Sequence, residues 1–210
     1  MSAREEILGR VRQALRSWPS ADGRVPRDYL RRHADADLVS LFAERVADYR
    51  ATVSRVPADA IPAAVAAALT TRGLAEVVAA PGLPAAWLPP VTGVTWLADE
   101  PPLTVAALDA CDGAVTTAAL GIALTGTIVL DAGVGQGRRV LTLVPDVHIC
   151  VLMADQIVAD VPDAVAALDP ARPLTFISGP SATSDIELNR IEGVHGPRTL
   201  HVIIGEGASA

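Results

Sequence analysis

Short apolar runs alternate with polar turns near the end of the chain. Two runs, Leu174–Ile177 and Leu200–Ile204, flank a Gly/Ser/Pro turn, a short polar stretch and a second Gly/Pro turn. This order predicts two buried parallel strands joined by a helical crossover. Ser184 and Glu187 fit the S-x-x-E capping box, so we expect the crossover helix to begin there.

The same pattern upstream predicts a body of short strands and helices beginning near Val56. The predicted strands are Ala75–Ala79, Val94–Leu97, Asp112–Ala123, Gly126–Leu130, Val140–Val144 and Val147–Leu152. The predicted helices are one capped by Asp59 with Pro62 in its first turn and ended by Gly73, then Leu103–Asp109, and Val161–Leu168 capped by Asp160. Several strands are joined by turns too short for parallel crossovers, so we expect an antiparallel portion. The fold class is therefore α/β, a three-layer sandwich around a mixed sheet.

Two amphipathic segments precede this body. Residues 2–17 place Ile7, Leu8, Val11 and Leu15 on one helical face, and Asp35–Arg50 repeats the 3–4 spacing. A stretch rich in Pro, Arg and Asp separates them. We expect residues 1–55 to form an N-terminal helical appendage and residues 56–210 to form the α/β domain.

Composition and charge narrow the function classes. Half of the 210 residues are hydrophobic, no apolar stretch reaches the ~18 residues of a membrane span, and no secretory leader is visible. These observations predict a soluble cytoplasmic protein. The net charge is -7, and residues 56–210 hold 6 Arg against 16 acids, which argues against a nucleic-acid surface.

Several kinds of chemistry are excluded by missing residue types. The chain has no lysine, which removes Schiff-base chemistry and any Walker A loop. Its two cysteines, Cys111 and Cys150, cannot by themselves hold an iron–sulfur cluster, and their apolar surroundings favour buried small side chains. The four histidines lack metal-ligand spacing, so we expect no metal site and no cofactor in this chain.

Polar residues gather just beyond the run Leu174–Ile177. They are Ser178, Gly179, Ser181, Thr183, Asp185 and Glu187. Ligands of open α/β sheets bind at the carboxyl edge, so this cluster predicts a substrate-binding site there. The alternative is that these groups only cap a helix. Two acids in its first turn make a bare phosphate less suitable than a carboxylic acid, a sugar or a neutral polar ligand.

Three further places carry candidate binding residues. His195 precedes Gly-Pro and has the backbone position of a general base or a substrate-positioning group, or of a loop histidine bonded to backbone. His148 begins a predicted strand. Thr125, Gly126 and Thr127 precede another, where Gly126 allows close backbone approach or forms a bulge. The loop Gly133–Gly137 (GVGQG) resembles half of a dinucleotide fingerprint but lacks its strand–helix context.

Together these segments resemble a known family. ISGPSATSDIE, GVHGPRTLHVII, TGTIVL and the pair Val147-His148 are similar to the lactate utilization protein C family (LutC/YkgG) of LUD-domain proteins, over about Ala75 to Glu206. The resemblance implies the fold of ribose-5-phosphate isomerase and the CoA transferases (NagB/RpiA/CoA transferase-like). It also implies a role in oxidising L-lactate to pyruvate, with an iron–sulfur partner and a second cysteine-rich partner.

One position departs from the family pattern. Relatives commonly read E-T-G-T, whereas this chain has Leu124 before Thr125, Gly126 and Thr127. A leucine cannot transfer protons, so a carboxylate that acts there in relatives is missing here, and no residue is assigned a catalytic role.

Two functional hypotheses follow. In the first, the chain is a lactate utilization subunit whose redox centres lie in partners. In the second, it is a free-standing enzyme or binding protein for a sugar phosphate, a CoA ester or another activated carboxylate, with Arg138, Arg139 and Arg198 contacting phosphate in place of lysine.

Overall fold

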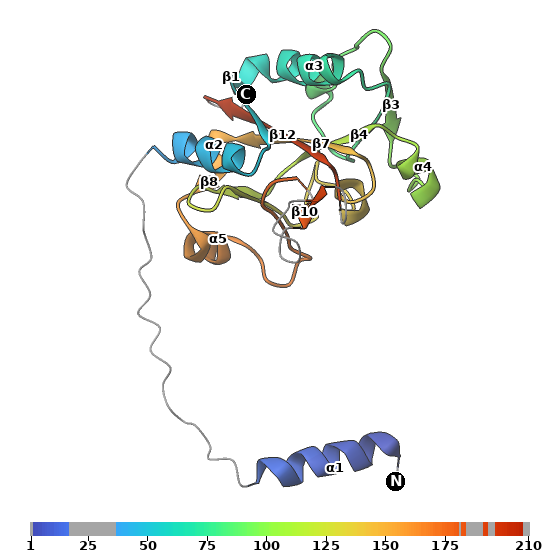
Figure 1. Cartoon of the computed structure of the whole chain (residues 1–210), viewed down its shortest axis with the longest axis vertical. Helices are drawn as coiled ribbons and strands as arrows, with labels where there is room; N and C mark the ends of the chain where they lie inside the picture. Colours follow the sequence, from blue (N-terminus) through green and yellow to red (C-terminus); the bar gives the residue numbers. More distant parts are fainter. Residues whose placement is uncertain (1, 17–36, 181, 184–190, 193–195, 208–210) are drawn as a thin grey trace. The chain divides into compact units, whose positions relative to one another are not determined.

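The computed structural model describes residues 2–16, 37–180, 182–183, 191–192 and 196–207 (Figure 1). The chain divides into two compact units, Met1–Leu30 and Arg31–Ala210. The first contains α1 (Ala3–Leu15), as predicted for residues 2–17. Ser2 and Glu5 close a capping box at its start, with Glu5 Oε2 accepting the Ser2 N–H at 2.7 Å.

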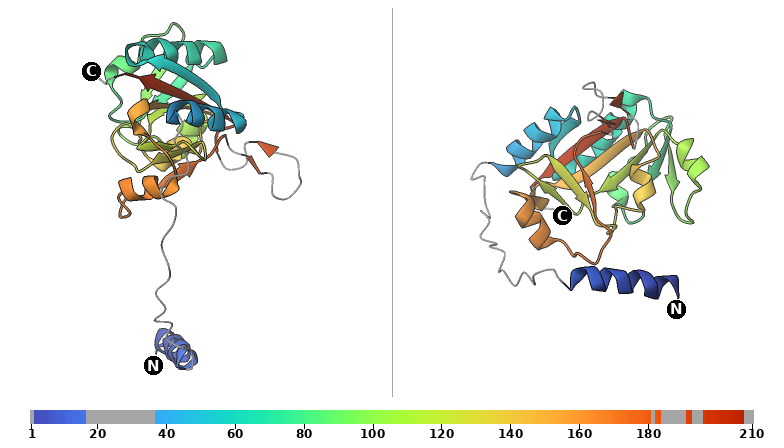
Figure 2. Two further views of the ribbon diagram at one scale, coloured as in Figure 1. Left: turned by 90° about the vertical axis from the view of Figure 1, so that its left-hand side faces the viewer. Right: turned by 60° about the horizontal axis from the view of Figure 1, so that its bottom comes forward.

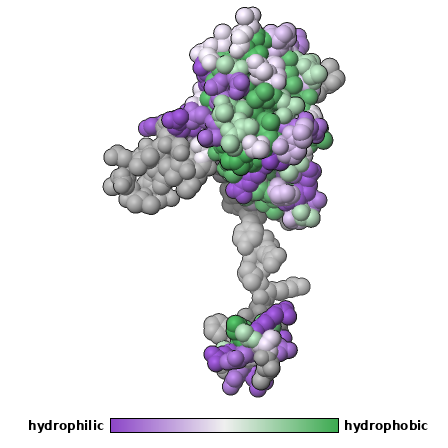
Figure 3. Space-filling view, turned by 90° about the vertical axis from the view of Figure 1, so that its right-hand side faces the viewer, coloured by the Kyte–Doolittle hydropathy of each residue, from purple (hydrophilic) through white to green (hydrophobic). Residues whose placement is uncertain are grey.

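Helix α1 keeps its apolar side chains at the surface. Ile7, Val11 and Leu15 are 48% or more exposed, and Figure 3 shows green hydrophobic atoms between the purple polar ones of this helix. No residue of α1 is buried. The predicted amphipathic face therefore exists.

Six parallel strands form the main sheet of the second unit, in the order β1-β12-β7-β4-β2-β3. Their bounds are Thr52–Pro57 (β1), Thr199–Glu206 (β12), Val147–Met153 (β7), Gly113–Thr117 (β4), Glu76–Ala79 (β2) and Thr95–Ala98 (β3). Every residue of β7 is buried. Six of its seven residues are apolar, the exception being His148, and this composition suits a parallel sheet whose two faces are both covered. Figure 2 shows β7 and β12 side by side at the centre of the molecule.

A second sheet has the order β8-β5-β6-β9. Its strands are Ile157–Val158 (β8), Leu120–Ile122 (β5), Thr127–Leu130 (β6) and Thr175–Ile177 (β9). β6 pairs antiparallel with both β5 and β9, so the predicted antiparallel portion is confirmed. Two short strands, β10 (Ala182–Thr183) and β11 (Ile191–Glu192), pair antiparallel with each other.

The predicted pairing of the two C-terminal runs is wrong. β9 lies in the smaller sheet, whereas β12 lies in the main sheet between β1 and β7. Both runs are apolar, but Phe176 is 48% exposed while Leu200 and Val202 are buried. Hydrophobic pattern alone does not say which sheet a short strand joins. The predicted crossover helix falls on residues 184–190, outside the described residues.

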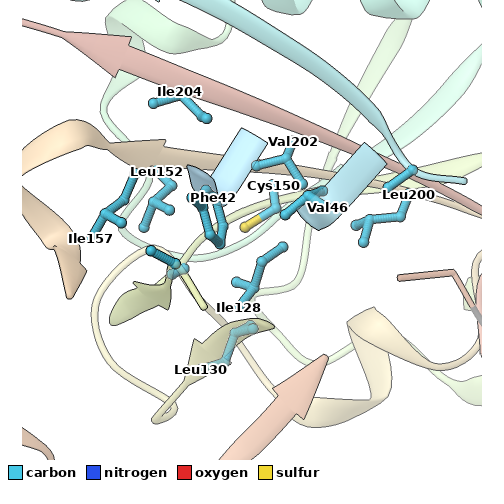
Figure 4. Close-up of a cluster of buried hydrophobic side chains, with 13 residues drawn as sticks. Phe42, Val46, Ile128, Leu130, Cys150, Leu152, Ile157, Leu200, Val202 and Ile204 are labelled. Carbon is cyan, nitrogen blue, oxygen red and sulfur yellow. The ribbon is translucent and has the colours of Figure 1, made fainter. Parts of the chain in front are cut away.

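Helices and the smaller sheet cover the main sheet in layers (Figure 1). α3 (Ile61–Arg72) packs on one face, with Val65 and Leu69 against Ile149 and Ile203. The other face meets α2 (Leu38–Asp48) and the smaller sheet. In Figure 4, Phe42 and Val46 of α2 lie among Cys150, Leu152 and Val202. The fold is thus the predicted α/β sandwich.

The outer elements complete these layers. α5 (Val161–Ala167) places Ala164 against Leu120 and Val129 of the smaller sheet. α4 (Val105–Asp109) packs Leu108 against Val78. Within the described residues, no helix combines the length and apolar character needed to cross a membrane.

The structure differs from the predicted domain boundary. The division between residues 55 and 56 falls inside β1, and α2, predicted as part of the appendage, contributes buried Phe42 and Val46 to the core. β1 is an edge strand with the partly polar sequence TVSRVP, so its hydrophobic pattern did not predict a buried strand.

Two local predictions are also wrong. The expected strand Val140–Val144 is mostly a 3₁₀ turn, Arg139–Thr142, which buries Leu141 completely. Asp59 lies in a 3₁₀ turn, Ala58–Ala60, and Ala60 is the N-cap of α3. Gly73 ends that helix in the left-handed conformation, as predicted.

Candidate functional site

A cavity of about 310 Å³ lies at the amino ends of β7 and β12. We call it the amino-edge pocket. Its polar lining residues are Arg139, Thr142, His148, Thr175 and Ser178. Its apolar lining residues are Leu143, Phe176, Ile177, Pro180, Pro197 and Leu200, with Gly179 and Gly196 beside them. The volume suits a small ligand.

Three hydroxyl groups form a chain at one side of this pocket. Thr125 Oγ1 lies 2.7 Å from Thr127 Oγ1, which lies 2.8 Å from Ser178 Oγ. Each hydroxyl both donates and accepts, so the chain fixes the orientation of the Ser178 hydroxyl at the pocket. The sequence proposed these residues separately, and the pairing of β6 with β9 brings them together.

The T-G-T turn is pressed against helix α2. Gly126 has φ +59°, and a Cβ there would lie 2.6 Å from the carbonyl carbon of Arg45. Glycine is therefore required by both the backbone conformation and the close approach. Of the two sequence readings, close approach is the one the structure supports, and the neighbour is the protein's own backbone.

His148 lies under the pocket as a neutral group. Its ring is 1% exposed, and Nε2 lies 2.8 Å from Thr116 Oγ1. Burial lowers the pKa of His148 to about 4. At pH 7 the ring therefore carries no charge, and it acts as a hydrogen-bonding group in the wall rather than as a cation.

Neither thiol is activated. Burial raises the pKa of Cys150 to about 12, although a hydrogen bond with Thr116 opposes the shift. Burial also raises the pKa of Cys111, whose Sγ donates to the Ala107 carbonyl at 3.0 Å. Nucleophilic catalysis needs a thiolate, so both cysteines act as packing residues.

The three proposed phosphate-binding arginines have different surroundings. Arg138 bonds Asp99 through Nε at 2.7 Å and NH2 at 2.6 Å, which lowers the pKa of the Asp99 carboxyl. Arg198 Nε donates to exposed Asp146 at 2.6 Å. Arg139 alone of the three lines the amino-edge pocket, and it forms no ion pair with the described residues.

The predicted site residues divide into four groups. Ser178, Gly179 and His148 line the pocket, and Thr125, Gly126 and Thr127 support it through the hydroxyl chain and the turn. Thr183 lies in β10 opposite Ile191. Ser181, Asp185, Glu187 and His195 lie outside the described residues.

The expected position of the site needs correction. Ser178 follows β9, which belongs to the smaller sheet, and faces the amino edge of the main sheet instead of its carboxyl edge. Sequence reasoning also missed the pocket residues Thr142 and Thr175 and the supporting Thr116. Each lies in a largely apolar run, where a threonine gives no signal of a binding site.

The described residues include no group of three or more His, Cys, Asp and Glu side chains placed to hold a metal ion. What the pocket offers is one guanidinium, several hydroxyls and a neutral imidazole. This set suits a small carboxylate, because arginine binds carboxylate oxygens in pairs and hydroxyls bond a neighbouring oxygen. Of the three arginines proposed to contact phosphate, Arg139 alone lines this pocket, so a phosphorylated ligand would meet one guanidinium here.

Comparison with known proteins is consistent with one family. The LUD domain model matches residues 104–204. A lactate utilization protein C from Deinococcus radiodurans is 49% identical over 174 residues, 80% of each chain. Another, from Halalkalibacterium halodurans, is 35% identical over 102 residues, 44% of each chain. A solved structure of a DUF162 family protein from Deinococcus radiodurans matches with TM-score 0.69 and 41% identity, covering 83% of this chain and 99% of that one.

Proposed function

The chain belongs to the lactate utilization protein C family of LUD-domain proteins, and from this premise we propose that it is a subunit of a system that oxidises L-lactate to pyruvate. The single observation that supports the proposal most is the 49% identity to a protein named for lactate utilization over 80% of each chain.

The proposed reaction requires an electron acceptor. Oxidation of the lactate C–OH to a ketone releases two electrons and two protons. This sequence has two cysteines, both buried, and an iron–sulfur cluster needs about four thiolates. We therefore assign the redox centres to iron–sulfur and cysteine-rich partner proteins, which take up the electrons.

The role proposed for this chain is to bind the 2-hydroxy acid in the amino-edge pocket. The Arg139 guanidinium pairs with the carboxylate, and the hydroxyl of Ser178, oriented by Thr127, bonds a substrate oxygen. Among the described residues, the pocket lining contains no aspartate or glutamate, so none of these side chains repels a carboxylate.

A binding experiment tests the pocket. Arg139→Gln should weaken L-lactate binding, measured by calorimetry, by about tenfold or more, because a charge-assisted hydrogen bond contributes about 1.5–3 kcal/mol. Arg198→Gln is the matched control, since Arg198 is exposed, is paired with Asp146 and is absent from the pocket lining. Equal effects of the two substitutions would contradict the assignment of Arg139.

A second experiment tests the system. Deleting the gene should abolish growth on L-lactate and leave growth on pyruvate unchanged, and a tagged chain should co-purify with cysteine-rich iron–sulfur proteins. Normal growth on lactate together with no such partner would overturn the proposed function.

A further inference from the structure

A second and larger concavity, of about 840 Å³, lies at the opposite edge of the main sheet. We call it the carboxyl-edge groove. Trp87 follows β2, Thr117 ends β4, and Asp155 follows β7, so three neighbouring parallel strands point their carboxyl ends at it. Its polar lining also includes Asp131, Gln136, Gln156, Asp169 and Arg172.

The groove coincides with the point where the order of the strands reverses. From β2 the chain moves outward to the edge strand β3, then returns to β4 on the other side of β2 and continues to β7 and β12. The segments that follow β2 and β4 therefore leave the sheet toward opposite faces and open a crevice between them. Open α/β sheets bind ligands at such a reversal.

The glycine-rich loop Gly133–Gly137 forms part of the wall of this crevice. The Gly135 N–H donates to the Pro81 carbonyl at 2.9 Å, and the Gly135 carbonyl accepts from Thr117 at 2.7 Å. Gly135 has φ +75°, and a Cβ there would lie 2.9 Å from Thr117 Oγ1. The loop thus joins the two segments on either side of the strand reversal, a role its resemblance to a nucleotide fingerprint did not suggest.

Internal hydrogen bonds hold the polar walls. Gln156 Oε1 accepts from Met153 at 2.8 Å, and its Nε2 donates to the Ala118 carbonyl at 2.9 Å. Asp131 accepts from Gln136 Nε2 at 2.7 Å and pairs with Arg172 at 2.9 Å. These groups shape the groove and are already engaged.

The charged side chains of the groove lining that have no ion-pair partner among the described residues are carboxylates. Asp155 and Asp169 also line the groove, and neither forms an ion pair with a described residue. With Asp131 balanced by Arg172, the lining carries a net charge of about -2. Lactate, phosphates, nucleotides and CoA esters are all anions, so the negative charge of the groove lining repels them.

Apolar surface accompanies these carboxylates. Trp87 is a half-buried part of the lining, which also includes Leu168, Met153 and the 83% exposed Val134. The groove lining thus combines an indole with carboxylates, and these two kinds of group attract a cation through the ring quadrupole and through charge. We propose that the carboxyl-edge groove binds a small organic cation, an amine or amidine with an apolar portion, separately from the anion-binding pocket at the other edge.

The test uses three probes of one shape and different charge. Benzamidine is cationic, benzamide neutral and benzoate anionic, and their binding to the full chain is measured by calorimetry at low and physiological salt. We expect saturable benzamidine binding at least about tenfold tighter than that of benzamide, no benzoate binding, and weaker benzamidine binding at higher salt.

Matched variants locate the binding. Asp155→Asn should weaken benzamidine binding about fivefold, which is the effect of about 1 kcal/mol for an exposed charge pair. Asp109→Asn removes the same charge from α4, outside the groove lining, and should leave it unchanged. Absence of saturable benzamidine binding, equal binding of the three probes, or equal effects of the two substitutions would overturn the proposal. Lactate binding at Arg139 is measured separately, so failure of one site is distinguishable from failure of the other.

Discussion

His148 and His201 are the two buried imidazoles of the described residues. His148 bonds Thr116 beneath the amino-edge pocket, and His201 Nε2 lies 2.8 Å from Ser54 Oγ. Burial lowers the pKa of each to about 4, and for His201 the charge of Arg72 adds to the effect. Both are therefore neutral hydrogen-bonding groups at pH 7.

These two groups predict how stability depends on pH. In the unfolded chain a histidine takes up a proton below about pH 6.5, whereas in the folded protein it does so only below about pH 4. The unfolded state therefore binds more protons in this window, and the free energy of unfolding falls as pH is lowered from about 6.5 to 4. The loss is at most on the order of 3 kcal/mol for each group.

Urea unfolding at a series of pH values measures this effect. His148→Gln keeps a hydrogen-bonding side chain beside Thr116 but does not titrate, so the fall in stability should become shallower in the variant. Asp109→Asn, an exposed position, should keep the full slope. An unchanged slope in His148→Gln would contradict the buried neutral state.

Among the secondary-structure elements, α2 and the T-G-T turn depend on each other. The turn brings Gly126 against the backbone of Arg45. Helix α2 in turn buries Phe42 and Val46 in the core between the main sheet and the smaller sheet. The hydroxyls of the turn reach Ser178 at the pocket. The position of α2 is thus coupled to the shape of the amino-edge pocket.

Two glycine substitutions separate steric contact from backbone strain. Gly126→Ala forces a Cβ to 2.6 Å from Arg45, and Gly93→Ala has a similarly positive φ of +82° with nothing within 4 Å. Gly93→Ala should lower the free energy of unfolding by about 1–2 kcal/mol through backbone strain alone. Gly126→Ala should cost about 1–3 kcal/mol more through overpacking. Equal losses in chemical denaturation would show that the contact with α2 is not tight.

At the scale of the whole molecule, the main sheet separates two concavities of opposite character. Of the residues that the structure describes, the amino-edge pocket is lined by Arg139 and by no acid, and the carboxyl-edge groove is lined by three aspartates and one arginine. β7 runs from one to the other over seven residues, a distance of about 20 Å. That distance exceeds the screening length of about 8 Å at physiological salt.

The two places should therefore act independently. Arg139→Gln should leave benzamidine affinity unchanged within about twofold, and Asp155→Asn should leave lactate affinity unchanged to the same extent. In the double variant the changes in binding free energy should add within about 0.5 kcal/mol. A larger interaction in calorimetry would mean that one site transmits its state to the other.

The amino-acid sequence by itself determined the α/β class, most of the elements and the family. Mostly apolar runs such as Val147–Leu152 and the capped helices carry strong local signals, because burial on both faces and helix termination depend on neighbouring residues. The T-G-T and G-P-S motifs were found as polar groups next to strands, before their partners were known.

Only the tertiary structure decided which of these groups meet. Leu174–Ile177 and Leu200–Ile204 look alike in hydrophobicity, yet they join different sheets, and that choice moved Ser178 to the amino edge beside His148 and Arg139. The reversal between β2 and β4 lies at the other edge, where the glycine-rich loop and Asp155 line the same groove. Strand pairing depends on contacts between residues far apart in the chain, so no local pattern contains it.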